Sequence, residues 1–268
     1  IEVIVSSWSR LDATSAVSYL MDDYRGWDSQ LLASLAFVNL VHQDSLLARE
    51  RLMDLPEGWD SADFWDAYLQ GDTNLNWIEK ATWVRSLSSD EDGYHAMYFL
   101  MKHWAKQNGP EASEWLQQSS DIEERNEYAR VVGESWAHLH PQSAAAWAWA
   151  LPQGFERGHI LGDVIAVWAK QDVVASGEFV NQLEWFGDLD IVVSSYVDTA
   201  AQSDPEIIMG WARSIEEPQL RMNSIRRITE KWIQKNPESI FDWMQSASLE
   251  NDEKQAVVEV WNKHYPEQ

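Results

Sequence analysis

The stretch WAHLHPQSAAAW (136–147) decides the fold, because variants of it recur at multiples of a 32-residue period. These variants are WAKQNGPEASEW (104–115), AAQSDPEIIMGW (200–211) and WIQKNPESIFDW (232–243). The opening positions form a first series: Trp104, Trp136, Trp168 and Trp232, with Ala200 in the gap. The closing positions, eleven places later, form a second series: Trp115, Trp147, Phe179, Trp211 and Trp243. A fixed period of this length is typical of stacked structural repeats.

Each repeat predicts a short helix followed by a longer one. Asp204 and Asn236 directly precede a proline, which is a helix start because the side chain caps free N–H groups and Pro fits the first turn. Apolar side chains then recur at helical spacing in residues 122–136, 155–168 and 220–232. One such hairpin cannot bury its apolar face alone, so neighbouring hairpins are expected to stack with Trp between them.

Residues 1–93 are less regular in their aromatic pattern. Helices are expected at 28–42, 44–55, 60–70, 75–87 and 94–107, and Asp12 is expected to cap another. The helix at 28–42 is predicted to be amphipathic, and its apolar side chains are Leu31, Leu32, Leu35, Phe37, Val38 and Val41. The chain is thus predicted to be all-α with about 17 helices. We expect one elongated domain over 1–268, irregular in 1–93 and regular in 94–268.

The pattern W-A-x-x-x-P-x-x-A-x-x-W, with two helices in each 32-residue period, resembles the tandem helical hairpins of α-solenoids. Tetratricopeptide-like repeats are similar in period, and bacterial repeat proteins with W-A-x-x-[DN]-P-x-A-A-x-W units are similar in their tryptophans. The resemblance implies a right-handed superhelix of antiparallel helix pairs with a binding or scaffolding role. It implies no catalytic residue.

Composition excludes several functions. The 44 acidic and 20 basic side chains give a net charge of −24, which disfavours binding to nucleic acid and to anionic lipid. The absence of Cys excludes disulfides, zinc ribbons and thiol nucleophiles. No segment is apolar enough to cross a membrane. The lack of Cys and a first residue other than Met favour an exported bacterial protein on the extracytoplasmic side, with a cytoplasmic location as the alternative.

Three arginines are the main polar candidates for a site. Arg125, Arg157 and Arg221 each stand eleven positions before a first-series Trp, so Arg and Trp share a helix face. They could form a ladder that binds carboxylates or a chain terminus. Alternatively, each could pair with an acid or stack on a Trp to lock adjacent hairpins. Leu189 interrupts the ladder.

Trp149 and Trp185 lie off the 32-residue frame and are candidates for stacking on a partner. The seven histidines are scattered without a metal-binding motif, so no metal and no cofactor are expected.

The function predicted from these features is a non-catalytic scaffold that binds a basic peptide or protein on a concave acidic surface. One alternative is a carbohydrate-active or cell-wall enzyme module, because Trp and acidic groups are typical of sugar clefts. A second alternative is a nucleic-acid mimic that binds a basic DNA-binding protein. The oligomeric state stays open.

Overall fold

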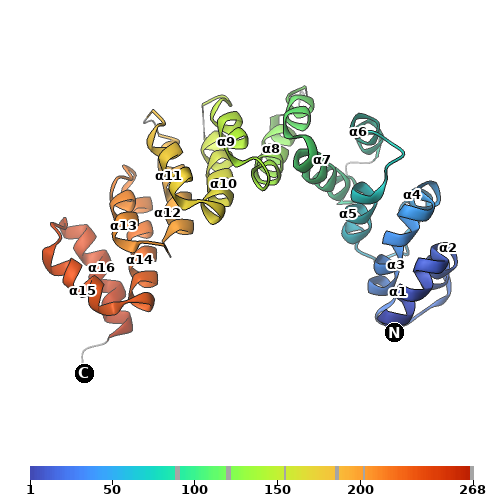
Figure 1. Ribbon diagram of the computed structural model, residues 1–268, viewed down its shortest axis with the longest axis horizontal. Coiled ribbons are helices and arrows are strands. Elements are labelled where there is room, and N and C mark those ends of the chain that lie inside the picture. Colours follow the sequence, from blue (N-terminus) through green and yellow to red (C-terminus); the bar gives the residue numbers. More distant parts are fainter. Residues whose placement is uncertain (88–90, 119–121, 154, 185–186, 202, 266–268) are drawn as a thin grey trace. The chain divides into compact units, whose positions relative to one another are not determined.

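The computed structural model describes residues 1–87, 91–118, 122–153, 155–184, 187–201 and 203–265. All regular secondary structure in these ranges is helical, as predicted (Figure 1). The chain divides into two compact units, Ile1–Gln107 and Asn108–Gln268. No helix in the described ranges has the length and apolarity that crossing a membrane requires.

The first unit holds helix pairs with short connections. Its helices are α1 (Glu2–Leu11), α2 (Ala13–Ser18), the π-helix η1 (Tyr19–Asp23), α3 (Ser29–Gln43), α4 (Ser45–Leu52), α5 (Ala62–Gly71), α6 (Trp77–Arg85) and the first part of α7 (Glu91–Gln117). Helix α3 packs against both α1 and α5. Helix α7 is broken at Asn108, whose backbone is not helical (φ −147°, ψ 79°), and the second unit begins at this residue.

The second unit alternates long and short helices. After the end of α7 come α8 (Ile122–Ala137), α9 (Pro141–Trp149), α10 (Phe155–Gln171), α11 (Val173–Asn181), α12 (Leu189–Ala200), α13 (Pro205–Arg213), α14 (Pro218–Lys235), α15 (Pro237–Ser246) and α16 (Asn251–His264). Helix α10 packs against α8 and α12, and α14 packs against α12 and α16. Figure 1 shows α9, α11 and α13 in one layer beside α10, α12 and α14 in another.

A helix N-cap recurs with the 32-residue period along both units. The cap positions are Asp12, Asp44, Asn76, Asn108, His140, Asp172, Asp204 and Asn236. At all of them except His140, the side chain accepts a hydrogen bond from the backbone N–H three residues later. The predicted cap at Asp12 is therefore confirmed. The 32-residue period therefore extends into residues 1–107, where the caps at Asp12, Asp44 and Asn76 show it.

The cap residue also closes the helix before it. The N–H groups of Asp12, His140, Asp172 and Asn236 donate to the carbonyls of the tryptophans four residues earlier, at 2.8–3.0 Å. One residue therefore ends a long helix and starts a short one, so the corner between them is tight. We call residues separated by whole periods of the repeat equivalent.

The two aromatic series meet within each repeat. Trp136 contacts Trp147 and Trp232 contacts Trp243, with ring centroids 6.0 and 5.3 Å apart. The first-series tryptophans at 104, 136, 168 and 232 are buried, as predicted. Where this series has Ala200, Tyr196 one turn earlier makes the edge contact with Trp211 instead, at 5.2 Å. In this repeat the aromatic ring that packs on the second-series Trp therefore comes from a residue one helical turn earlier.

A buried ion pair replaces the aromatic at one first-series position of the first unit. Asp72 is equivalent to Trp104 and Trp136, and its side chain is fully buried. Lys80 lies 3.5 Å from the Asp72 carboxylate and donates to the carbonyls of Leu69 and Asp72. Tyr68, four residues before Asp72, contacts Trp83 edge-on at 5.4 Å, as Tyr196 contacts Trp211.

Candidate functional site

Arg157 is held by contacts within the fold. Its side chain is 5% exposed, and Nε and Nη2 both lie 2.8 Å from Oδ2 of Asp188. Its guanidinium stacks over the ring of Trp149 at 4.6 Å from the ring centroid. Arg157 therefore joins α10 to residues on either side of it, which is the locking role considered from the sequence. Trp149 was predicted to stack on a partner, but the guanidinium of Arg157 lies over its ring.

Arg221 is also satisfied by its own surroundings. Its Nη1 donates to the carbonyls of Ile215 and Glu216 at 2.8 and 3.3 Å, just before α14 begins. Trp185, the other predicted partner contact, lies outside the described residues.

Arg125 differs from the other two arginines. It is half-buried and lines a cavity of about 530 Å³ between the end of α7, α8, α9 and the start of α10. Within the described ranges it forms no hydrogen bond and no ion pair. Of the three arginines in the predicted ladder, Arg157 and Arg221 are thus bonded within the fold. Arg125 is bonded to no described residue, and we call it the open arginine.

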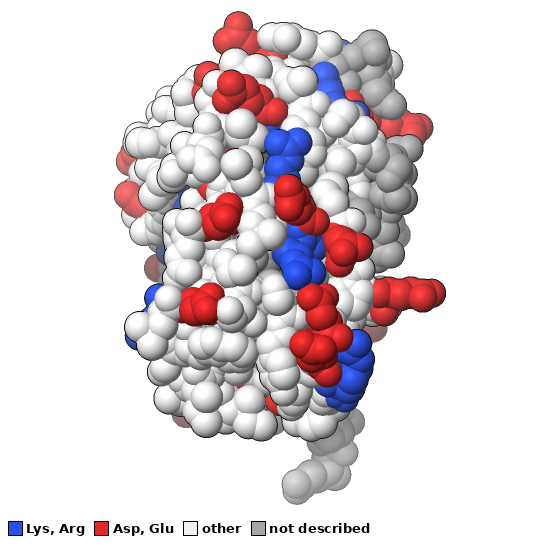
Figure 2. Space-filling model, turned by 90° about the vertical axis from the view of Figure 1, so that its right-hand side faces the viewer, with Lys and Arg blue, Asp and Glu red and all other residues white. Residues whose placement is uncertain are grey.

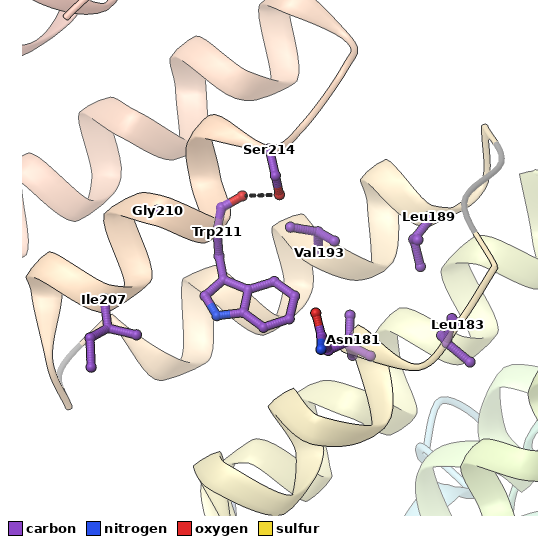
Figure 3. Close-up of a pocket in the computed structure, with 9 residues that line it drawn as sticks. Asn181, Leu183, Leu189, Val193, Ile207, Gly210, Trp211 and Ser214 are labelled. Atoms are coloured by element: carbon purple, nitrogen blue, oxygen red, sulfur yellow. Dashed lines mark hydrogen bonds between the residues drawn. The ribbon is translucent and has the colours of Figure 1, made fainter. Parts of the chain in front are cut away.

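A second pocket occupies the equivalent place two repeats later (Figure 3). Its volume is about 410 Å³, and the indole of Trp211 lines it beside Asn181. Equivalent residues line the two pockets: Leu116 and Val180, Gln117 and Asn181, Arg125 and Leu189, Ala129 and Val193, Trp147 and Trp211. A pocket therefore recurs at this place in two repeats, and of these two pockets only the one beside α8 has an arginine.

Helix α3 presents an exposed apolar stripe. Leu31, Leu35 and Val38 are 48, 40 and 44% exposed, and Trp27, two residues before the helix, is 97% exposed. Leu32, Ala33, Ala36, Phe37, Leu40 and Val41 on the other side of α3 are buried between α1 and α5. The expectation of one apolar face on this helix was wrong: it has two. The excess of apolar residues over what one helix face holds was the signal in the sequence.

The surface elsewhere carries interleaved charges. Figure 2 shows one face on which basic side chains lie next to acidic ones along a line, with uncharged surface around them. In the second unit, ion pairs link successive long helices: Arg130 to Asp163, Arg227 to Asp198, and Arg226 to Glu259, at 2.7, 2.7 and 3.2 Å. These pairs join residues about one repeat apart, so they align neighbouring hairpins.

A serine, a histidine and an aspartate meet in the first unit. Ser61 Oγ lies 3.2 Å and Asp60 Oδ1 lies 3.8 Å from Nδ1 of His95. A nucleophile and its base need one ring nitrogen for the serine and the other for the acid. Here both groups share Nδ1, so the arrangement is a local hydrogen-bonded cluster at the start of α5. No group of three or more His, Asp or Glu side chains that could hold a metal ion occurs among the described residues.

Comparisons with models of known families, with curated proteins and with solved structures found no match. The chemistry of the candidate surfaces is therefore inferred from the residues themselves.

Proposed function

We propose that the protein is a non-catalytic scaffold that binds a partner protein on the exposed face of α3. The observation that carries this proposal is the apolar stripe of Leu31, Leu35 and Val38. Contiguous exposed apolar surface on a folded protein is typical of a protein–protein contact. A helical-repeat array of the tetratricopeptide-like kind, with a right-handed superhelical path, is the architecture that we propose for this scaffold.

The repeat itself does not require apolar side chains at these positions. The residues equivalent to Leu35 include Asp163 and Arg227, and those equivalent to Val38 include Asp198 and Glu230. In the second unit these equivalents form ion pairs between long helices. Since charged residues serve the fold at the positions of Leu35 and Val38, the fold itself does not require apolar side chains there.

The partner is proposed to contribute an amphipathic helix with a basic polar side. Leu31, Leu35 and Val38 follow one line along α3, which fits a helix lying alongside. The equivalent residue of Leu31 on the neighbouring α5 is Asp63, so an acidic edge is expected beside the stripe. The net charge of −24 adds a long-range attraction for basic partners, which speeds association at low salt.

Matched helical peptides test the chemistry of this surface. Two peptides share one apolar face and differ only in a Lys-rich or a Glu-rich polar face. We expect the Lys-rich peptide to bind in fluorescence anisotropy, and added salt to weaken it. Combined Leu31→Ser, Leu35→Ser and Val38→Ser substitutions should reduce its affinity about tenfold or more. Val174→Ser, at an exposed valine of α11, is the control. Equal binding by the triple variant and the wild type would refute the α3 site.

Photo-crosslinking then tests the scaffold role. Benzoylphenylalanine at position 35 should form a discrete adduct in an extract of the source cells, and the same group at position 174 should not. Mass spectrometry of the adduct should map to a segment with an apolar face and Lys or Arg on its polar face. An acidic segment, or adducts identical at both positions, would contradict the proposal.

A further inference from the structure

The open arginine in the second unit has a site built around it. Arg125, Arg157 and Arg221 are equivalent in the repeat, and the latter two are bound by Asp188 or by backbone carbonyls. Arg125 forms no hydrogen bond and no ion pair in the described ranges, although Glu156, the residue equivalent to Asp188, lines the same cavity. A guanidinium is always charged and offers a planar set of donors that matches a carboxylate. In a protein with 24 excess negative charges, a half-buried arginine without an acid partner needs an explanation.

One sequence difference accounts for the open space beside Arg125. The residue equivalent to Gln117 in the next repeat is Trp149, which stacks on Arg157 and fills that space. Gln117 is smaller, and the space next to Arg125 stays open at about 530 Å³. This is within the range of about 300–1,000 Å³ that small-ligand sites have. In the pocket two repeats later, Leu189 replaces the arginine, so no cation is present at that position.

The lining of the cavity indicates what it accepts. Leu116, Ile122 and Trp147 provide apolar surface, while Gln117, Asn126 and Gln153 provide amide groups beside Arg125. The indole N–H of Trp147 is buried and has no hydrogen-bond acceptor within the described part of the chain. Since this nitrogen has almost no exposed surface, Trp147 offers a ligand in the cavity its apolar ring and not its N–H group.

We propose that this cavity binds a carboxylate that carries an apolar group, as the last residue of a peptide chain does. The carboxylate pairs with Arg125, the amides of Gln117 and Asn126 orient it, and the apolar side chain packs against Trp147 and Ile122. Glu156 also lines the cavity, so a ligand with one negative charge is favoured over a ligand with two. Because the site lies in the second unit, it does not depend on the α3 surface.

Calorimetric titration of the full chain with N-acetyl-leucyl-leucine tests this assignment, and its C-terminal amide is the matched ligand control. We expect the acid to bind about tenfold or more tightly than the amide, because only the acid forms charged hydrogen bonds with Arg125. N-acetyl-leucine and inorganic phosphate complete the series. Weaker binding by N-acetyl-leucine than by the dipeptide supports a peptide terminus. Equal binding by all the carboxylates and phosphate would reduce the site to a general anion site and overturn the proposal.

Three variants locate the binding. Arg125→Gln should lower the affinity for the acid about tenfold or more and leave the amide unchanged. Arg130→Gln removes the same charge from the same helix at a position paired with Asp163, and should leave the affinity within about twofold. Gln117→Trp, which copies Trp149, should fill the cavity and abolish binding while the thermal midpoint is retained. Binding that survives both Arg125→Gln and Gln117→Trp would overturn the site.

Discussion

Arg125, Arg157 and Arg221 occupy one repeat position but have three environments. The difference comes from residues outside their own helices: Asp188 and Trp149 for Arg157, and two carbonyls for Arg221. The sequence could therefore align the arginines, but not tell the structural ones from the open one. A side chain in a repeat is shared by two neighbours, and only the packed structure shows which neighbour satisfies it.

Gly109 is expected to be required for the packing of Trp136. A Cβ atom at position 109 would lie 2.1 Å from Cδ2 of this buried tryptophan, much closer than van der Waals contact. Gly109→Ala should therefore destabilise the protein by about 1–3 kcal/mol. Gly210→Ala meets no atom within 4 Å and should stabilise helix α13 by about 0.5–1 kcal/mol. Urea unfolding of both variants checks the sign, and destabilisation of equal size in both would contradict the steric argument.

Lys80 is expected to contribute less to stability at neutral pH than at alkaline pH. Burial lowers its pKa below 10.5, although Asp72 raises it in part. Between the folded pKa and 10.5 the unfolded chain binds more protons than the folded one, so stability from this group rises with pH. The stability difference between the wild type and Lys80→Met should thus grow as the pH approaches 10.5. At neutral pH the variant should already lose about 3–5 kcal/mol, because the Asp72 carboxylate stays buried without its partner.

Urea unfolding at several pH values measures this difference. Lys106→Met, at an exposed lysine of α7, should change stability by no more than about 0.5 kcal/mol and show no such trend. A difference for Lys80→Met that stays constant with pH would contradict the burial argument.

At the scale of the elements, the caps define the repeat more completely than the aromatics do. The aromatic series is interrupted at Asp72 and Leu40, where a buried ion pair or an aliphatic side chain takes the place of Trp. The caps at Asp12, Asp44 and Asn76 continue through this region. An N-cap satisfies backbone N–H groups that have no other partner, whereas several residue types can fill a core. This explains why the aromatic pattern of residues 1–93 is irregular.

His140 is the one cap position whose side chain accepts no cap hydrogen bond among those described. Its backbone (φ −138°, ψ 63°) resembles that of Asp172 (φ −150°, ψ 96°), so Asp should cap α9 there. His140→Asp is expected to stabilise the protein by about 1 kcal/mol, through the cap bond and the helix dipole. Asp172→Ala should lose about the same amount. Denaturant midpoints give both values, and a destabilised His140→Asp protein would show that position 140 is constrained by other contacts.

At the scale of the whole molecule, the charge and the repeat are separate properties. Each ion pair between long helices takes one acidic and one basic side chain, so the pairs leave the net charge of −24 unchanged. The 32-residue register sets which side chains meet. Ion pairs recur between residues 33 positions apart, which is one more than the 32-residue period. Arg130 with Asp163 and Glu230 with Lys263 are examples. A chain organised in this way should tolerate removal of one full repeat.

Deletion of residues 205–236 tests that register. It removes α13 and α14 and joins Asp204 to Pro237, which restores a cap followed by proline. Trp243 then takes the place of Trp211 beside Tyr196, and Lys263 faces Asp198 in place of Glu230. We expect a folded chain with cooperative urea unfolding and a smaller denaturant slope, because less surface is exposed on unfolding. The lost ion pair between Arg213 and Glu253 should lower its stability.

Deletion of residues 205–230 is the control, because it joins Asp204 to the middle of α14 and shifts every later residue out of register. The aromatic positions of α15 and α16 then no longer face Tyr196, and the cap lacks a helix start. Although this deletion removes fewer residues, we expect it to abolish cooperative unfolding in the second unit. Circular dichroism and urea titration distinguish the two chains. If the shorter deletion were the better folded of the two, the 32-residue register would not govern the packing of these helices.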